Sequence, residues 1–218
     1  MQLLARPGKV AAGCDPGIHL LGVRQQRDSL LYVPKSAEPN RPAPLLVFLH
    51  GAGGSEHQGI ERLRSFADEL GFLVLSPASQ GTTWDAIRDS YGRDVRMIDQ
   101  ALTRAFAARL VDTRRIAVSG FSDGASYALG LGLSNGDLFG SVLVFSPCFI
   151  PAGGKRAGKP RIFVSLGTSD SILPIGSCSR RLVPELTQAG YAVTYREFDG
   201  PHTVPREIKA AAIHWFLA

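Results

Sequence analysis

The chain has 218 residues, of which 44% are hydrophobic and 20% are charged, and it carries a net charge of +5. These proportions are those of a folded globular protein, and no run approaches the ~18 consecutive apolar residues of a membrane-spanning helix. The arginines and lysines are scattered and accompany no nucleic-acid-binding motif, so we expect neither a membrane span nor a nucleic-acid partner.

The N-terminal half begins with two apolar runs, 18–23 and 29–33, and the polar stretch between them predicts a β-hairpin. The unbroken apolar run 45–49 predicts a strand that is buried on both faces, as in a parallel sheet. The elements expected after it are a helix over 60–70, a strand over 72–75, an irregular stretch over 76–91 and an amphipathic helix over 94–110.

The C-terminal half continues this alternation. A strand from Ile116 leads into a helix of small residues, and the elements expected after it are strands over 142–145, 162–166 and 193–198 and helices over 178–189 and 204–216. The alternation predicts an α/β fold, a mostly parallel sheet covered by helices on both faces, as a single domain over 1–218. Only a short loop separates residues 146 and 161, so we expect no cap domain and an open cleft.

A Gly-x-Ser-x-Gly motif stands between the strand from Ile116 and the helix that follows it. The motif is Gly120-Phe121-Ser122-Asp123-Gly124, and in a strand-turn-helix context it predicts a nucleophile elbow, with the serine hydroxyl above the sheet. Glycines on both sides of the serine remove the Cβ atoms that would collide in so tight a turn. The alternative is an ordinary strand-to-helix connection, and the other motifs favour the elbow.

Three residues that together make a catalytic triad each follow a predicted strand. They are Ser122, Asp170 and His202, in the chain order serine, acid, histidine that is expected with this elbow. A serine hydroxyl needs a base to take its proton, and the base needs a third group to orient it. Asp199 is the alternative acid, but it lies three residues before His202 and would have to fold back on its own loop.

A second glycine-rich turn, from His50 to Ser55, follows the strand over 45–49. Its exposed backbone N–H groups suit an anion-stabilising loop, whereas a phosphate-binding loop is excluded because no Gly-Lys-Ser/Thr follows. We expect the oxyanion hole to consist of the N–H groups of Ala52 and Asp123, each worth about 3 kcal/mol in the transition state. The Asp123 carboxylate should point away from the oxyanion, and His50 should hold the loop by hydrogen bonds.

Five apolar or aromatic residues are candidates for the substrate walls, because they lie in loops after strand ends, where ligands bind in open α/β sheets. The alternative for all five is packing of the loops themselves. They are Trp84, Phe149, Ile150, Ile172 and Leu173.

The cysteines Cys14, Cys148 and Cys178 show no Cys-x-x-Cys spacing, so neither a metal site nor a disulfide framework is indicated. A bridge between Cys148 and Cys178 is possible because both follow strands at one sheet edge, but free buried thiols are the expected state. We expect no metal and no other cofactor. The first residues have no sustained apolar segment behind a basic start, so we expect no secretory signal and a cytoplasmic location.

Together these residues resemble the α/β-hydrolase superfamily, in particular the phospholipase/carboxylesterase and polyhydroxybutyrate-depolymerase-like serine esterases. The resemblance spans the chain from about residue 30 and is carried by four motifs, which are 49–54, 120–124, 167–170 and His202. Acyl-protein thioesterases usually have Gln and then Gly-Gly after the nucleophile, where this chain has Asp123-Gly124-Ala125. Dienelactone hydrolases use cysteine as the nucleophile, whereas this chain has Ser122.

The resemblance implies a serine carboxylesterase that forms an acyl-enzyme, and the open cleft favours short- to medium-chain esters. Two alternatives within hydrolysis are a thioesterase and a polyester depolymerase. A non-catalytic binding module of the same fold is a remote alternative, since such a module is expected to lose a triad member. The expected partner is a small-molecule ester, and the oligomeric state is left open.

Overall fold

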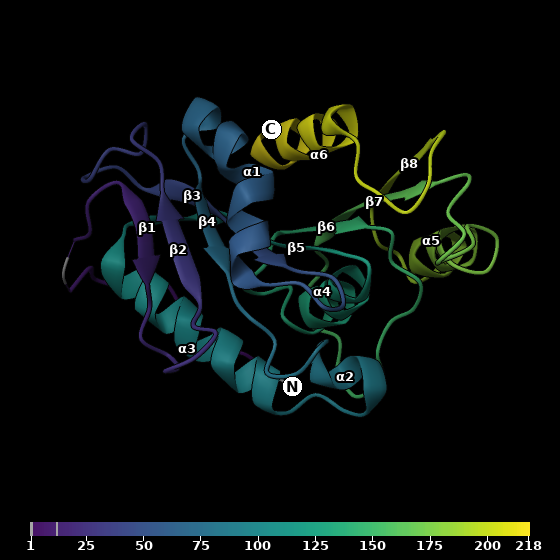
Figure 1. Ribbon diagram of the computed structural model, residues 1–218, viewed down its shortest axis with the longest axis horizontal. Helices are drawn as coiled ribbons and strands as arrows, with labels where there is room; N and C mark the ends of the chain where they lie inside the picture. The colour runs from purple at the N-terminus through teal and green to yellow at the C-terminus, as the bar shows by residue number, and fades with distance from the viewer. Residues whose placement is uncertain (1, 12) are drawn as a thin grey trace.

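The computed structural model describes residues 2–11 and 13–218 (Figure 1). The strands are β1 (Gly17–Leu20), β2 (Leu30–Val33), β3 (Ala43–Leu49), β4 (Leu73–Ser76), β5 (Val111–Phe121), β6 (Ser141–Phe145), β7 (Arg161–Gly167) and β8 (Val193–Phe198). The helices are α1 (Glu56–Leu70), α2 (Asp85–Arg88), α3 (Arg93–Ala108), α4 (Asp123–Ser134), α5 (Ser179–Gln188) and α6 (Arg206–Leu217).

The strands form one sheet in the order β1-β2-β4-β3-β5-β6-β7-β8. Strand β2 pairs antiparallel with both β1 and β4, so the predicted hairpin lies at one edge, and every other pairing is parallel. A parallel sheet brings the carboxyl ends of its strands to one edge, where the loops that follow them meet. The predicted mostly parallel α/β fold is confirmed.

Strand β3 illustrates why the sheet has two buried faces. Its seven residues are all buried, and successive side chains point to opposite sides. Leu46 and Phe48 enter the core on one face of the sheet, whereas Leu45, Val47 and Leu49 enter the core on the other. An unbroken apolar run is therefore what this central strand requires.

The helices divide between these two faces, as Figure 1 shows. Helices α1 and α6 cover one face with side chains that include Leu63 and Phe216. Helices α3, α4 and α5 cover the other, with side chains that include Ile98, Leu129 and Leu182. Within the described part of the chain, no helix is both long and apolar enough to cross a bilayer.

The predicted bounds of β5 differ most from the structure, because this strand begins at Val111 and not at Ile116. The Asp112 carboxylate accepts hydrogen bonds from the backbone N–H of Arg114 (3.0 Å) and the Nε of Arg115 (2.8 Å). The pairing with β3 is irregular over this segment. Exposed polar residues at the bulge interrupt the apolar pattern, which is why the pattern predicts a shorter strand.

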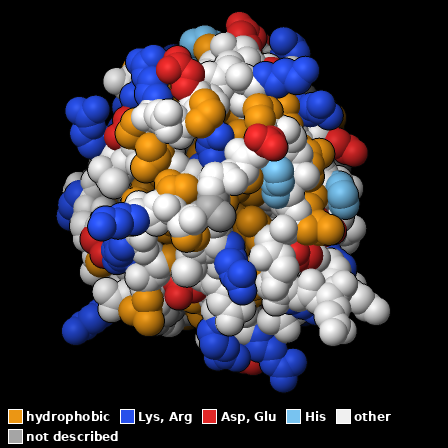
Figure 2. Space-filling view, turned by 90° about the vertical axis from the view of Figure 1, so that its left-hand side faces the viewer, with side chains coloured by type: hydrophobic (Ala, Val, Ile, Leu, Met, Phe, Trp, Pro, Cys, Tyr) orange, Lys and Arg blue, Asp and Glu red, His pale blue; other side chains and the backbone are white. Residues whose placement is uncertain are grey.

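The loop between β6 and β7 holds no helix or strand, so nothing there forms a cap. The basic side chains are spread over the face in Figure 2, with acidic and hydrophobic side chains between them, in keeping with the scattered arginines and lysines of the sequence.

Candidate active site

Ser122 lies at the sharp turn between β5 and α4, with backbone angles φ 57° and ψ −123°. A positive φ is strained for a residue with a side chain, and the flanking glycines allow the turn to close. A Cβ on Gly120 would lie 2.3 Å from the carbonyl oxygen of Gly124, and a Cβ on Gly124 would lie 2.3 Å from that of Leu49. Both glycines are therefore required by the close approach of β5, α4 and β3.

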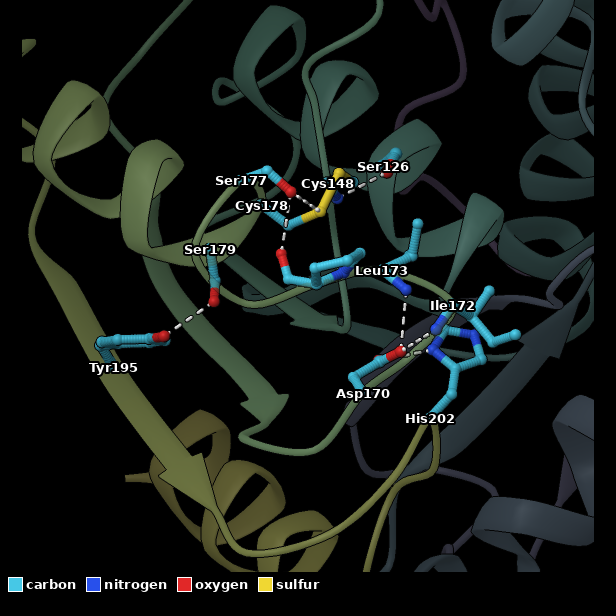
Figure 3. Close-up of a disulfide and its surroundings, with 11 residues drawn as sticks. Ser126, Cys148, Asp170, Ile172, Leu173, Ser177, Cys178, Ser179, Tyr195 and His202 are labelled. Atoms are coloured by element: carbon cyan, nitrogen blue, oxygen red, sulfur yellow. Dashed lines mark hydrogen bonds and ion pairs between the residues drawn. A yellow bond between two sulfur atoms is a disulfide. The ribbon is translucent and has the colours of Figure 1, made fainter.

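The structure brings together the three residues predicted to form a triad. The Nε2 of His202 lies 2.9 Å from the Oγ of Ser122, and its Nδ1 lies 2.6 Å from the Oδ2 of Asp170 (Figure 3). A carboxylate only accepts, so Nδ1 carries the proton and Nε2 is free to accept the serine O–H. This is the hydrogen-bonded order that activates a serine nucleophile.

The carboxylate of Asp170 is held from its other side by its own loop. Its Oδ1 accepts the backbone N–H groups of Ile172 (2.9 Å) and Leu173 (2.8 Å), which leaves Oδ2 for the imidazole (Figure 3). The residue is only 4% exposed. These two bonds satisfy the buried charge and fix the direction of the carboxylate.

The loop after β7 (the acid loop, which carries Asp170) and the loop after β8 (the histidine loop, which carries His202) are joined by backbone hydrogen bonds. The N–H of Thr168 donates to the carbonyl of Phe198 (2.9 Å), and the N–H of Ser169 donates to that of Gly200 (3.1 Å). A Cβ on Gly167 would lie 2.2 Å from the Gly200 carbonyl oxygen. The glycine that ends β7 thus permits the two loops to touch, and this contact fixes the position of Asp170 relative to His202.

Asp199, the alternative acid, does not face the imidazole. Its carboxylate lies on the surface, where its Oδ1 is 3.5 Å from the hydroxyl of Thr168. The geometry therefore favours Asp170 as the acid, from a loop that approaches His202 independently.

Phe121, beside the imidazole of His202, and Arg62, which packs on Phe121, are absent from the sequence-based candidates. The ring of Phe121 lies 4.7 Å from that of His202, centre to centre, and the Arg62 guanidinium lies 5.2 Å from the centre of the Phe121 ring. Phe121 occupies a variable position of the elbow motif, and this position is the only feature of the sequence that places it near Ser122. Arg62 lies on α1, far away in the chain, so nothing in the sequence connects it to the site.

The glycine loop, residues 50–55, lies beside Ser122, since a Cβ on Gly51 would lie 3.4 Å from the Cβ of Ser122. The N–H of Gly53 donates to the carbonyl of Thr82 (2.6 Å), and the N–H of Gly54 donates to that of Gly51 (3.0 Å). Within residues 2–11 and 13–218, the N–H groups of Ala52 and Asp123 have no backbone carbonyl as partner. Both remain available for a developing oxyanion.

Two side chains from other parts of the chain support this arrangement. The guanidinium of Arg27 donates to the carbonyls of Gly54 (2.8 Å) and Gly81 (2.9 Å), which ties the glycine loop to the loop after β4. The Asp123 carboxylate accepts the Thr83 hydroxyl at 2.6 Å. This bond fixes the carboxylate toward the loop after β4.

His50 is buried beneath the glycine loop and does not contact Ser122. Its Nε2 accepts the N–H of Ser79 (3.0 Å), so its Nδ1 carries the proton that is donated to the carbonyl of Gly51 (2.8 Å). Burial lowers the pKa of this imidazole below its usual value, which keeps it neutral. The bonds are those expected of a residue that holds the loop.

The predicted position of Trp84 in the cleft is wrong. Its side chain is 0% exposed, its ring packs 4.9 Å from that of His50, and its Nε1 donates to the His50 carbonyl (2.8 Å). A fully buried ring cannot line an open cleft. Trp84 therefore supports the glycine loop from below, because burial of its large ring stabilises the loop after β4 against the core.

The other four wall candidates separate into two groups. Phe149 and Ile150 line a cavity of about 390 Å³ between α4, α5 and the loop after β6, and none of the triad residues lines this cavity. Ile172 lies beside His202 and is 66% exposed, whereas Leu173 packs against a buried cluster behind the acid loop (Figure 3). Of the five candidates, only Ile172 is both exposed and next to the triad.

The expectation of free thiols at Cys148 and Cys178 is wrong, because the two sulfur atoms form a disulfide. The loops after β6 and β7 run close together at the edge of the sheet, a proximity that sequence spacing does not reveal. Cys14 remains a free thiol.

We expect the stability of the fold to depend on pH through His50. Because the folded pKa is lowered, the unfolded chain binds the proton more readily. The contribution of His50 is therefore complete above its unfolded pKa of about 6.5 and is lost as pH falls through the folded pKa. The Tm of the wild type should fall more steeply between about pH 7 and pH 5 than that of His50→Gln. If the plots of Tm against pH were parallel for the two proteins, the lowered pKa of His50 would be contradicted.

Comparison with known proteins agrees with the fold. Residues 23–159, more than half of the chain, match the model of the Esterase family, described as "Putative esterase". This range contains the glycine loop and Ser122 and ends before Asp170. A bifunctional acetylxylan esterase/xylanase, XynS20E of Neocallimastix patriciarum, is 31% identical over 155 residues. That match covers 67% of this chain, which spans 22% of the length of the relative.

Solved structures of low sequence identity share the fold. Esterase PE8 superposes with a TM-score of 0.70 at 19% identity, over 86% of this chain and 96% of that one. The carboxylesterase of Bacillus cereus superposes with a TM-score of 0.68 at 20% identity, over 88% of this chain and 94% of that one. With the strand-elbow-helix geometry and the family match, these likenesses lead to one assignment. The chain belongs to the Esterase family and has the α/β-hydrolase fold.

Proposed function

We propose that this protein is a serine carboxylesterase in which Ser122, His202 and Asp170 form the catalytic triad. The observation that carries the proposal is the unbroken hydrogen-bonded chain from the serine hydroxyl through the imidazole to the buried carboxylate. Ser122 attacks the ester carbonyl while the Nε2 of His202 takes its proton, and Asp170 holds the imidazole and stabilises the imidazolium that forms.

The negative charge that develops on the ester oxygen is stabilised by the N–H groups of Ala52 and Asp123. His202 then gives its proton to the leaving alcohol, and an acyl group remains on Ser122. Water, activated by the same imidazole, attacks this acyl-enzyme and releases the acid. Every proton is therefore moved by one residue, so the reaction needs no group beyond the chain and water.

The natural substrates that we propose are short- to medium-chain esters. Support comes from the absence of secondary structure between β6 and β7 and from the exposure of Ile172 next to the imidazole. A site without a cap offers little enclosed apolar surface, so it gains little from burying a long acyl chain. A thioester or a polyester remains an alternative within the same chemistry.

A second candidate substrate is an acetyl ester carried by a polysaccharide. The relative XynS20E is named for acetylxylan esterase and xylanase activities, and this chain matches 22% of its length. An open cleft admits an ester that projects from a polymer. Release of acetate from acetylated xylan would favour this candidate over esters of small alcohols only.

The experiment that tests the proposed function compares p-nitrophenyl acetate, butyrate, octanoate and palmitate, with Ser122→Ala as the control. We expect rapid hydrolysis of the two shorter esters, slow hydrolysis of palmitate, and no hydrolysis by the variant. Turnover that is absent for all four esters, or unchanged in the variant, would refute the serine esterase.

The location that we propose is a compartment in which disulfides persist. The absence of a secretory signal pattern predicts the cytoplasm, but disulfides are rare there because thiols are kept reduced. The Cys148–Cys178 bridge therefore argues for an oxidising compartment. Rapid alkylation of the protein in its host should find one free thiol; three would restore the cytoplasmic expectation.

A further inference from the structure

The disulfide joins two loops that leave the carboxyl ends of neighbouring strands. Cys148 lies in the loop after β6, and Cys178 directly precedes α5, at the end of the segment that begins with Asp170. Figure 3 shows Leu173 between the bridge and the pair formed by Asp170 and His202. The disulfide therefore joins the C-terminal end of the segment 170–178, which carries Asp170, to the loop after β6.

On the side of Asp170, the bridge and Leu173 share one small buried cluster. Cys178 belongs to a small buried cluster with Leu166 and Ile175, and both Cys148 and Leu173 pack against it. The backbone N–H of Leu173 donates to the Oδ1 of Asp170 at 2.8 Å. A shift of Leu173 away from the bridge would therefore move a donor of the acid itself.

On the nucleophile side, the bridge is tied to the first turn of α4. The backbone N–H of Cys148 donates to the Oγ of Ser126 (3.1 Å), whose side chain is buried within α4. The N–H of Ser126 in turn donates to the carbonyl of Ser122 (3.1 Å). Cys148 is thereby fixed relative to the nucleophile.

We propose that the Cys148–Cys178 disulfide and Leu173 are positioning residues that fix the catalytic acid relative to the nucleophile; this inference rests on the proposed function. The contacts form a closed circuit that runs from Ser122 through His202, Asp170 and Leu173 to the bridge, and returns through Ser126. A covalent link limits how far the two loops can separate. Catalysis is sensitive to such separation, since a displacement of about 1 Å can cost roughly a hundredfold in rate.

The first test opens the bridge in the folded enzyme. Dithiothreitol is oxidised to its cyclic disulfide, and the two sulfur atoms take up two electrons and two protons to become thiols. We expect reduction, or the double variant Cys148→Ser/Cys178→Ser, to lower kcat roughly 10- to 100-fold at 25 °C with KM changed less than about twofold. Cys14→Ser, which removes the free thiol, is the matched control and should retain full kcat.

The second test asks whether the effect passes through the acid. In an Asp170→Asn background the acid no longer orients the imidazole, so opening the bridge should change the residual kcat by less than about twofold. A bridge that only stabilises the fold would lower Tm without this non-additivity. Leu173→Ala keeps the disulfide and removes the packing contact, and it should reproduce the loss of kcat and the same non-additivity, even where the double variant does not fold.

The outcomes separate this inference from the proposed function. Activity of the oxidised wild type on p-nitrophenyl butyrate, and its loss in Ser122→Ala, decide the proposed function alone. Unchanged kcat after reduction or in Leu173→Ala, a loss fully additive with Asp170→Asn, or three free thiols in the oxidised protein would each overturn the positioning role. A loss that is non-additive with Asp170→Asn supports it.

Discussion

Replacing Ser122 with alanine is expected to lower kcat on p-nitrophenyl butyrate by roughly a million-fold, to the level left by transition-state binding alone. The variant loses only the hydroxyl that lies 2.9 Å from the Nε2 of His202. The elbow backbone should persist, because its conformation is maintained by Gly120 and Gly124 and the N–H of Ser122 still donates to the carbonyl of Phe145.

The measurement is kcat together with the far-ultraviolet circular dichroism spectrum and Tm, which should change little. Ser65→Ala, on the exposed surface of α1, is the matched control and should retain full activity. A fluorophosphonate should add its mass to the wild type and to the control but not to Ser122→Ala. Labelling of the variant at another serine would show that the nucleophile lies elsewhere.

Replacing Asp170 with asparagine is expected to lower kcat about ten-thousand-fold. The amide preserves the shape of the carboxyl group but removes the charge that stabilises the imidazolium. Its NH₂ group also donates, so it competes with the N–H that now points from Nδ1 to Oδ2 at 2.6 Å. The imidazole would then favour the tautomer that cannot accept the Ser122 proton at Nε2.

Asp199→Asn is the matched control for this change. It alters the same residue type, three positions before His202, at a carboxylate whose neighbour is the hydroxyl of Thr168. We expect this variant to retain most of the wild-type kcat. If Asp199→Asn were inactive and Asp170→Asn active, the acid would be assigned to the wrong loop.

Features that depend on neighbouring residues could be predicted from the amino-acid sequence. The run Leu45 to Leu49 indicates a strand buried on both faces, and the structure has β3 there. The elbow is likewise local, because Gly120 and Gly124 flank Ser122 within one turn. The parallel topology then predicts which loops lie together, since residues that follow parallel strands meet at one edge of the sheet. This is why the sequence alone predicts that Asp170 and His202 lie close to Ser122, as they do.

Features that depend on which loops touch could be seen only in the three-dimensional structure. Trp84 follows a strand, as a cleft residue does, but only the packing of its ring on His50 shows that it is buried. The spacing of Cys148 and Cys178 does not give the distance between their loops, which is set by the adjacent positions of β6 and β7. Side-chain contacts between distant segments are not periodic in the sequence, so no local pattern records them.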